Sequence, residues 1–280
     1  MQEGVNGKDY DEEAALQQAL KASLETVEEQ KPQETLYPIV GLVEHYHSKV
    51  EKVVTTNQES KEERDRGCHL FATETDFWYY NCMDEMDRGW GCTYRVMQMV
   101  FSNLQKQRFL KDSKMPSLRE IQQRLATLPG YSPRIVGSRK WLEPPDANNY
   151  FKSYKLAGYD TTYNFAKERC ANKFFEDLKC HFSTLRTPVI VDDKFSTYGI
   201  LGVAEGSEGD SKVLIFDPHM HVKKTMTIED FEEQSATKGG WRAIKEHFKK
   251  KLWMVYYPLG SGSTMEDRHN SRDCGSCILS

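Results

Sequence analysis

The sequence predicts an α+β fold, in which a buried helix comes early in the domain and strands follow it. Apolar residues recur at helical spacing on more than one face over 93–105, which indicates a largely buried helix. The runs at 212–216 and 252–257 are short and apolar, as in buried strands. An amphipathic helix is expected over 167–185, and the Ser-Leu-Arg-Glu run at 117–120 is a capping box that predicts the start of another helix.

The chain is predicted to contain one domain with a polar segment on either side of it. Residues 1–35 are acidic, glutamine-rich and nearly without aromatic side chains, so we expect a flexible tail with a helix at about 9–27. Residues 36–66 are expected to connect this tail to the globular domain, which is predicted over 67–259. A second flexible tail is expected over 260–280, because it begins with Gly-Ser-Gly-Ser.

Composition argues against several classes of protein. A formal net charge of −4 gives no positive surface for nucleic acid. Seven cysteines without paired spacing, and no apolar stretch at the N-terminus, favour a reducing cytoplasm over secretion. No run approaches the roughly 20 apolar residues that a membrane-spanning helix requires. We therefore expect a cytoplasmic protein that does not bind nucleic acid.

Cys92 is a candidate nucleophile because of the residues around it. Gly89 and Gly91 interrupt the chain just before it, so Cys92 is expected in the first turn of the helix that follows. Unpaired N–H groups and the helix dipole favour an anion there, and a thiol must lose its proton to attack. Cys92 alone is weak evidence, since most unpaired cysteines are small buried hydrophobic residues.

Asp217 and His219 supply the base that a thiol nucleophile needs. They directly follow the predicted strand 212–216, and side chains two positions apart in a strand face the same way. The Asp217 carboxylate can then orient the His219 ring, which takes the proton from Cys92. His221 lies two positions after His219, so Asp217, His219 and His221 could share one face as metal ligands. No further ligands accompany them, so we expect neither a metal nor an organic cofactor.

Two runs, Gly-Trp-Gly-Cys-Thr-Tyr-Arg at 89–95 and Asp-Pro-His at 217–219, resemble motifs of the ubiquitin-fold-modifier-specific proteases. These are papain-like cysteine proteases that cut after the C-terminal glycine of a small ubiquitin-like modifier. Tyr80 lies twelve residues before the cysteine, where the family has a tyrosine. The Gly-Ser-Arg-Lys-Trp run at 137–141 is similar to a further family segment, and the resemblance covers roughly 68–259.

The resemblance implies a papain-like α+β domain that acts as a thiol protease or isopeptidase on a ubiquitin-like modifier and its conjugates, without a cofactor. Cys92 is then the nucleophile and His219 the base, and Tyr80 helps the Cys92 backbone N–H to hold the oxyanion. Trp90 and Trp141 are candidates for the walls of a channel that admits only a glycine-ended tail, with core packing as the alternative.

The chain departs from the family at Thr93, where glycine or alanine is usual, and over 192–197, where a glycine-rich stretch is usual. The related deubiquitinases place a histidine in that loop region, whereas this chain has none between His181 and His219. The modifier-specific branch is therefore favoured, with a deubiquitinase of the same fold as the alternative. A catalytically inactive, ubiquitin-binding membrane adaptor is a second alternative, which the intact catalytic residues oppose.

The N-terminal tail contains a segment at 11–25 that resembles a ubiquitin-interacting motif, with acidic residues at both ends. One face of the expected helix carries the residues suited to an apolar patch of a partner, namely Leu16, Ala19, Leu20 and Ser23. A generic acidic amphipathic helix is the alternative interpretation. A lone helix of this length is marginal in water, so we expect it to become ordered on binding ubiquitin.

The last four residues, Cys-Ile-Leu-Ser at 277–280, fit a prenylation pattern in which the terminal serine favours a farnesyl group on Cys277. One lipid chain holds a protein on a membrane only reversibly, so Cys274 is a candidate for a second lipid. We therefore expect a cytoplasmic protein attached to the surface of a membrane such as the endoplasmic reticulum.

Overall fold

The structure is a computed structural model, and every residue it describes belongs to one unit of the chain that begins at Pro38. The described residues are 39–41, 69–111, 114–167, 169–205, 211–220, 227, 230, 233–234, 238–249 and 252–260. The predicted tail at 1–35, most of the connecting segment 36–66 and all of 261–280 lie outside them. The predicted domain boundaries therefore stay predictions.

The helix that begins at Cys92 precedes the long strands of the domain, as the sequence predicts, but three short strands come before it. The α-helices are α4 (Cys92–Lys106), α5 (Leu118–Ala126), α6 (Pro144–Lys152), α7 (Arg169–Thr184) and α9 (Ile244–His247), with short 3-10 helices at Cys82–Asp84 and Pro133–Ile135. The strands are β1 (Ile39–Gly41), β2 (His69–Phe71), β3 (Thr75–Phe77), β4 (Ala157–Asn164), β5 (Val189–Asp192), β6 (Thr197–Glu205), β7 (Ser211–Phe216), β8 (Gly240–Ala243) and β9 (Leu252–Gly260). The predicted α+β class is confirmed. Within the described part of the chain, no helix has the length and apolar content to cross a membrane.

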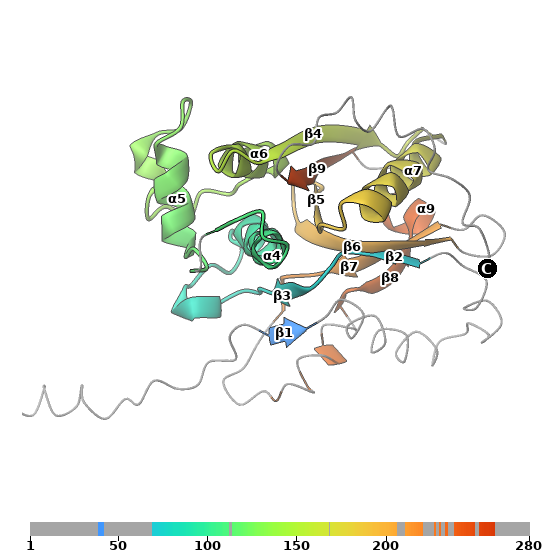
Figure 1. The fold of residues 1–280 in the computed structure, drawn as a ribbon, viewed down its shortest axis with the longest axis horizontal. Helices are drawn as coiled ribbons and strands as arrows, with labels where there is room; N and C mark the ends of the chain where they lie inside the picture. Colours follow the sequence, from blue (N-terminus) through green and yellow to red (C-terminus); the bar gives the residue numbers. More distant parts are fainter. Residues whose placement is uncertain are drawn as a thin grey trace, which may run out of the picture. The chain divides into compact units, whose positions relative to one another are not determined.

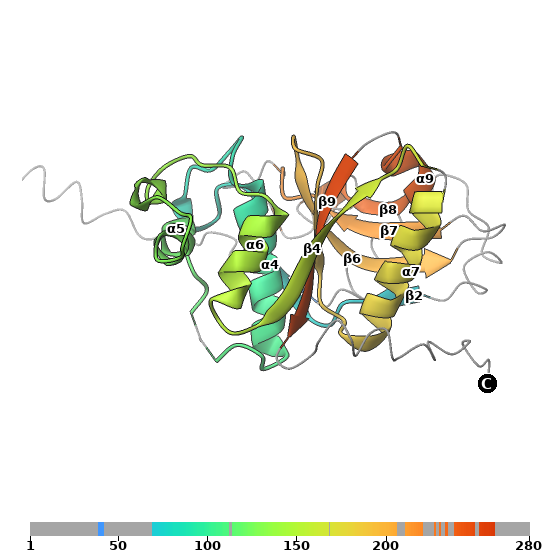
Figure 2. The ribbon, with the colours of Figure 1, turned by 90° about the horizontal axis from the view of Figure 1, so that it is seen from above.

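A seven-stranded antiparallel sheet forms the centre of the domain. Its strands lie in the order β4-β9-β5-β6-β7-β8, and β2 also pairs with β6. Helices α4 and α6 pack on one side of the sheet and α7 packs on the other (Figures 1 and 2). Because both faces are covered, β5 to β7 are mostly buried and read as near-continuous apolar runs. A separate two-stranded ladder joins β1 to β3.

Helix α4 is buried along nearly its whole length, from Cys92 to Leu104. Its polar side chains are satisfied within the protein, as buried polar groups require. The Asn103 amide donates to the Thr73 carbonyl (3.2 Å) and to the Thr75 hydroxyl (3.1 Å), which ties the helix to the start of β3. These contacts fix the helix that carries Cys92 within the core.

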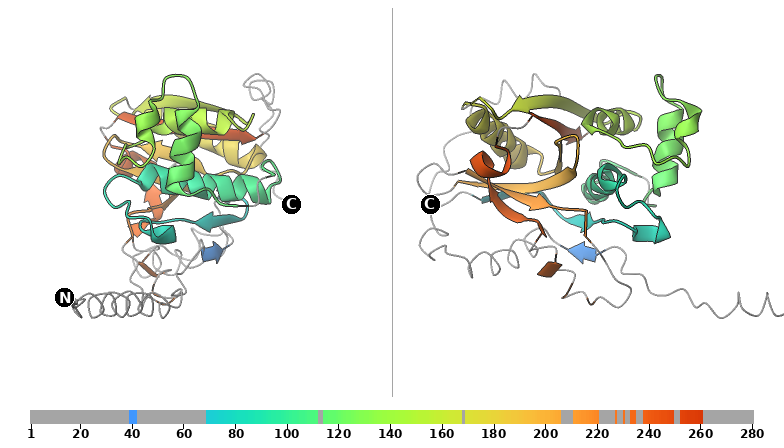
Figure 3. Two further views of the ribbon diagram at one scale, coloured as in Figure 1. Left: turned by 90° about the vertical axis from the view of Figure 1, so that its left-hand side faces the viewer. Right: turned by 180° about the vertical axis from the view of Figure 1, so that it is seen from behind.

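Helix α5 begins at the capping box that the sequence predicts. The Ser117 hydroxyl accepts the Glu120 backbone N–H (3.2 Å), and the Glu120 carboxylate accepts the Ser117 N–H (2.7 Å). The prediction of a helix start at this position is therefore confirmed. The helix packs against α6 rather than against the sheet, and Figure 3 shows it at the edge of the domain.

Candidate active site

Cys92 is the first residue of α4, as the two glycines before it predict. Gly91 is the N-cap residue, and a Cβ atom there would lie 2.2 Å from the Asp87 carboxylate, so only glycine fits. Gly89 has a φ of 85°, which a side chain would strain. The thiol therefore lies where unpaired backbone N–H groups and the helix dipole favour a thiolate.

A fully buried ion pair holds the loop before Cys92 against α4. Arg95 Nε donates to Asp87 Oδ2 at 2.8 Å, and both side chains are excluded from solvent. Arg95 also donates to the Cys82 carbonyl (2.9 Å) and to Gln98 Oε1 (3.0 Å), while Asp87 Oδ1 accepts the Asn81 N–H (2.7 Å). Arg95 and Gln98 thus support the nucleophile from within the core and do not reach the reacting atoms.

Asp217 orients His219 in the segment that directly follows β7. The strand ends at Phe216, so the alternation of strand side chains that we expected does not extend to this pair. Instead, Asp217 Oδ1 accepts both the His219 backbone N–H (2.9 Å) and the ring Nδ1–H (2.5 Å). The other ring nitrogen is left for Cys92, which acts on His219 by raising its pKa.

Tyr80 completes the group of sequence-predicted catalytic residues. Its backbone N–H donates to the Pro218 carbonyl (3.1 Å), which joins its segment to the turn that carries His219. Its ring lies edge-on to the His219 ring, with centroids 5.2 Å apart, and its hydroxyl is hydrogen-bonded to Cys92 and to the Gly89 N–H. Burial and the negative charge of Cys92 raise the pKa of Tyr80, so its hydroxyl stays protonated as a donor.

The electrostatics favour an imidazolium ion beside the thiol. Burial lowers the pKa of His219, but the hydrogen bonds and negative charges of Asp217 and Cys92 outweigh it and raise this pKa to about 9. At neutral pH His219 therefore carries a proton that it can give to a leaving group. The nucleophile Cys92, the charged acid His219 and the neutral donor Tyr80 thus lie close together. This is the arrangement that thiol-dependent acyl transfer requires.

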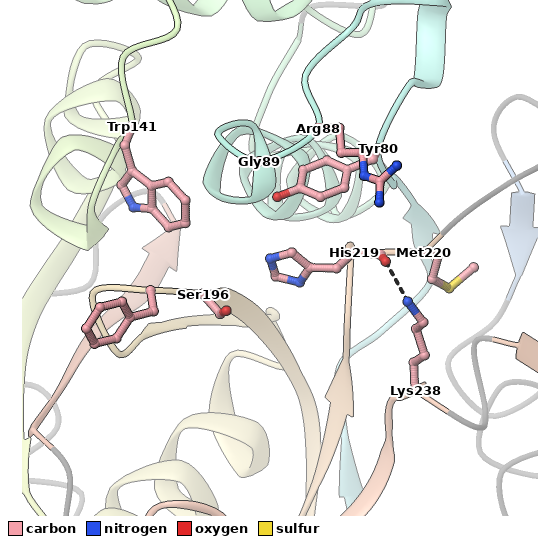
Figure 4. A pocket seen from close by; sticks show the side chains of 9 residues that line it. Tyr80, Arg88, Gly89, Trp141, Ser196, His219, Met220 and Lys238 are labelled. Atoms are coloured by element: carbon pink, nitrogen blue, oxygen red, sulfur yellow. Dashed lines mark hydrogen bonds between the residues drawn. The ribbon is translucent and has the colours of Figure 1, made fainter.

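Tyr80 and His219 line a pocket of about 330 Å³, shown in Figure 4, whereas Cys92 is fully buried and is not among the lining residues. Its lining residues are Tyr80, Arg88, Gly89, Trp141, Phe195, Ser196, His219, Met220 and Lys238. Trp141 lies in this wall, in agreement with one of the two predicted roles, whereas Trp90 is not among the lining residues and packs edge-on against Tyr94 (5.4 Å).

Sequence reasoning placed the segment 192–197, which contains Phe195, near the site, but it did not find Met220 and Lys238. Lys238 donates to the His219 carbonyl (2.8 Å) from nineteen residues away, and no local motif marks such a contact. Within the described ranges, no three His, Cys, Asp or Glu side chains gather as metal ligands, while His221 lies outside those ranges. The candidate ubiquitin-binding and lipidation residues also lie outside them, namely Leu16, Ala19, Leu20, Ser23, Cys274 and Cys277.

Residues 66–257 match the model of peptidase family C78. The chain belongs to this family. It is 32% identical over 155 residues to Ufm1-specific protease 2 of Danio rerio, covering 54% of this chain and 38% of the relative. It is also 32% identical over 169 residues to a probable Ufm1-specific protease of Oryza sativa subsp. japonica, covering 59% of this chain and 24% of the relative. The chain thus spans well under half the length of either C78 relative.

The fold of this C78 chain is also similar to that in the crystal structure of UfSP from Caenorhabditis elegans. The TM-score is 0.59 at 22% sequence identity, over 77% of this chain and 37% of the other. At this identity the likeness shows the fold alone, and it confirms the predicted papain-like α+β class. The match to the family model begins and ends close to the predicted domain of 67–259.

Replacing Asp217 with asparagine should lower the pKa of His219 from about 9, because the variant loses the charge that stabilises the imidazolium ion. A histidine whose pKa is raised above 6.5 in the folded state stabilises the protein below pH 6.5, and this contribution disappears as the pH rises through 9. The variant should therefore lose more stability at pH 6 than at pH 10. NMR titration of the His219 ring measures the shift directly, and an unchanged pKa would contradict the assigned role of Asp217.

Proposed function

We propose that this chain is a thiol protease and isopeptidase that processes or removes the ubiquitin-fold modifier Ufm1 by cutting after the modifier's C-terminal glycine. The observation that carries the proposal is the series from Asp217 through His219 to Cys92, in which Asp217 is hydrogen-bonded to His219, Cys92 acts on the pKa of His219, and His219 lines the pocket. The relatives are Ufm1-specific proteases, and they supply the substrate class.

The reaction follows from the positions of the side chains. At neutral pH His219 already holds the proton that Cys92 has given up, and the thiolate sulfur attacks the carbonyl carbon of the terminal glycine. The Tyr80 hydroxyl and the Cys92 backbone N–H hold the oxyanion that forms. His219 then gives its proton to the leaving amine, and the C–N bond breaks to leave a thioester. Water, deprotonated by His219, hydrolyses this thioester and releases the modifier with a free carboxylate.

Reaction with modifier probes tests the substrate. A Ufm1 probe with a C-terminal electrophile should label the chain faster than a ubiquitin probe, because the motifs of the domain resemble the modifier-specific branch and the loop histidine of the deubiquitinases is absent. We propose that ubiquitin binds separately, through Leu16, Ala19, Leu20 and Ser23, which would concentrate ubiquitin without aligning it for cleavage. A variant that starts at Leu36 should therefore lose binding to free ubiquitin and keep its rate with the Ufm1 probe.

The full-length chain and the variant that starts at Leu36 also distinguish the alternative functions. If ubiquitin remains the better substrate after truncation, the chain is a deubiquitinase of the same fold. If neither probe labels Cys92, the inactive ubiquitin-binding adaptor becomes the better interpretation. The alignment of His219 with both Asp217 and Cys92 argues against that adaptor, since a binding module has no need of a charged imidazole beside a thiol.

We also propose that the chain is cytoplasmic and attached to a membrane through a farnesyl group on Cys277, with Cys274 as the site of a second lipid. Each buried methylene contributes about 0.8 kcal/mol, yet one chain still binds only reversibly. Cys277→Ser should therefore release the protein from membranes, and Cys274→Ser should weaken attachment without blocking prenylation. Mass spectrometry of the C-terminal peptide from cells that prenylate proteins decides the question, because an unmodified end at 277–280 rules the proposal out.

A further inference from the structure

Asp192 is a buried carboxyl group that the proposed mechanism does not use. It is the last residue of β5, and its side chain is fully excluded from solvent. Among the described residues, its hydrogen-bond partners are the Lys194 backbone N–H, 2.7 Å from Oδ1, and the Thr197 hydroxyl, 2.5 Å from Oδ2. Neither of these two groups is charged. A carboxylate buried without a counter-ion is costly, and such a group becomes neutral by holding its proton.

Three contacts between oxygen atoms link Asp192 to the start of α4. The first joins Asp192 Oδ2 to the Thr197 hydroxyl (2.5 Å), and the second joins this hydroxyl to that of Thr93 (2.7 Å). The third joins the Thr93 hydroxyl to the Leu142 carbonyl oxygen (2.6 Å). All four residues are buried, and Thr93 directly follows Cys92. The series of contacts therefore passes one residue from the nucleophile.

The protons available to these three contacts can be counted. Each separation is that of an O–H···O hydrogen bond, and two oxygen atoms this close repel each other unless a hydrogen lies between them. Three contacts therefore require three protons. The hydroxyls of Thr93 and Thr197 supply one each, and the Leu142 carbonyl supplies none. The third proton must come from the carboxyl group of Asp192, which has one only in its neutral form.

The Lys194 backbone N–H determines which carboxyl oxygen carries this proton. It donates to Oδ1, so the proton belongs on Oδ2, which faces Thr197. The carboxyl group then donates to Thr197, Thr197 donates to Thr93, and Thr93 donates to the Leu142 carbonyl. Each hydroxyl in the series thus accepts one hydrogen bond and donates one.

The surroundings of Asp192 also favour the neutral acid. Burial raises the pKa of Asp192, and the negative charges of Asp193 and Glu143 raise it further, which outweighs the opposing effect of the hydrogen bonds from Thr197 and Lys194. The groups that carry charge at neutral pH on the neighbouring elements α4, α6 and β6 are Cys92, Arg95, Lys106, Asp146, Lys152 and Glu205. Arg95 and Lys106 are held in ion pairs with other carboxylates, and among the described residues no cation forms an ion pair with Asp192.

The series joins the two places at which the chain departs from its family. Thr93 stands where glycine or alanine is usual, and the segment 192–197 replaces a glycine-rich stretch. In the structure the Thr93 hydroxyl lies against the Thr197 hydroxyl. A hydroxyl that glycine or alanine would lack therefore has its partner in the altered segment, and the two departures form one structural unit.

We propose that Asp192 is a positioning residue that remains a neutral carboxylic acid at neutral pH and, as the first donor in the series through Thr197 to Thr93, holds the first turn of α4 with Cys92 in place. Asp192 touches neither the substrate nor the reacting atoms, so it acts through Thr93. The effect on catalysis rests on the proposed function, whereas the protonation of Asp192 does not.

Asp192→Asn tests the protonation, because asparagine resembles the neutral acid. Its oxygen accepts the Lys194 N–H, so its NH₂ group donates to Thr197 as the acid does. The wild type must hold a proton that the unfolded chain releases above the ordinary pKa of aspartate, so its stability relative to the variant falls as the pH rises. The variant should therefore unfold at a higher temperature than the wild type at pH 7, and this gain should shrink toward pH 4. A variant that is no more stable than the wild type at pH 7 overturns the inference.

Carbon-13 NMR of protein labelled at its aspartate carboxyl groups observes the proton state directly. The resonance that disappears in Asp192→Asn should have the chemical shift of a neutral acid at pH 7. A resonance with the shift of a carboxylate would show that Asp192 is ionised, which also overturns the inference.

Kinetics on a glycine-ended substrate test the positioning role. Thr197→Val keeps the shape of the side chain but breaks the series, so it should lower kcat by roughly threefold or more with little change in KM. Thr197→Ser restores the hydroxyl and should restore most of kcat. Thr187→Val is the matched control, because it removes a buried hydroxyl that donates to the Pro258 carbonyl (3.0 Å) outside the series. It should lose stability and keep its kcat.

The outcomes separate this inference from the proposed function. If Thr197→Val and Thr187→Val both lose stability and both keep kcat, the series serves the fold alone and the positioning role is overturned, while the activity stands. Failure of the wild type to cleave any glycine-ended substrate overturns the proposed function and the positioning role with it. The unfolding and NMR measurements need no substrate, so they decide the protonation of Asp192 in either case.

Discussion

Replacing Cys92 with alanine should abolish both turnover and covalent labelling by a modifier probe, because the change removes the attacking sulfur. The fold should survive, since the side chain becomes smaller by one atom and Cys92 takes no part in the ion pair between Asp87 and Arg95. Labelling is measured by intact-protein mass spectrometry, and folding by thermal unfolding monitored with circular dichroism.

Cys82→Ala is the matched control, because Cys82 is also a fully buried free cysteine. Burial raises the pKa of Cys82 to about 12, so this thiol stays protonated and unreactive at neutral pH. The Cys82 variant should therefore keep its labelling, with at most a modest loss of stability from the small cavity. Full labelling of Cys92→Ala would move the nucleophile elsewhere and remove the basis of the proposed mechanism.

The position of Cys92 could be predicted from the sequence because a helix start is a local property. Glycines before the cysteine and apolar periodicity after it are both visible in the chain, and the structure places the residue at the start of α4. The pairing of Asp217 with His219 is also local, but its geometry is not. The sequence pattern favoured a continued strand, whereas β7 ends at Phe216 and the Asp217 carboxylate accepts the backbone N–H of His219.

The walls of the pocket could be predicted only in part, because they depend on packing between distant segments. The sequence around Trp90 and Trp141 does not distinguish a pocket residue from a core residue. Their contacts in the structure do, because Trp90 packs on Tyr94 and Trp141 lines the pocket. The segment 192–197 departs from the family's glycine-rich stretch, so the sequence predicts a loop near the site. Only the structure shows that Phe195 and Ser196 are the residues of this segment that line the pocket.

Tyr80→Phe should lower kcat by roughly a hundredfold with little change in KM, because a hydrogen bond to an oxyanion strengthens only as negative charge develops in the transition state. The substitution keeps the ring, so the edge-on contact with His219 and the backbone hydrogen bond to Pro218 should remain. Steady-state kinetics on a glycine-ended substrate measure the effect.

Tyr94→Phe is the matched control for the loss of a buried hydroxyl. The Tyr94 hydroxyl donates to the Lys140 carbonyl (3.0 Å) and accepts from Gln122 (3.2 Å), so its removal should cost about 1 kcal/mol of stability. It should leave kcat nearly unchanged, because neither partner approaches Cys92. If Tyr80→Phe and Tyr94→Phe have the same small effect on kcat, Tyr80 serves packing alone, and the oxyanion must be held by backbone N–H groups at the start of α4. A large effect confined to Tyr80→Phe would instead show that the oxyanion has two donors, the Cys92 backbone N–H and the Tyr80 hydroxyl, and that the second comes from outside α4.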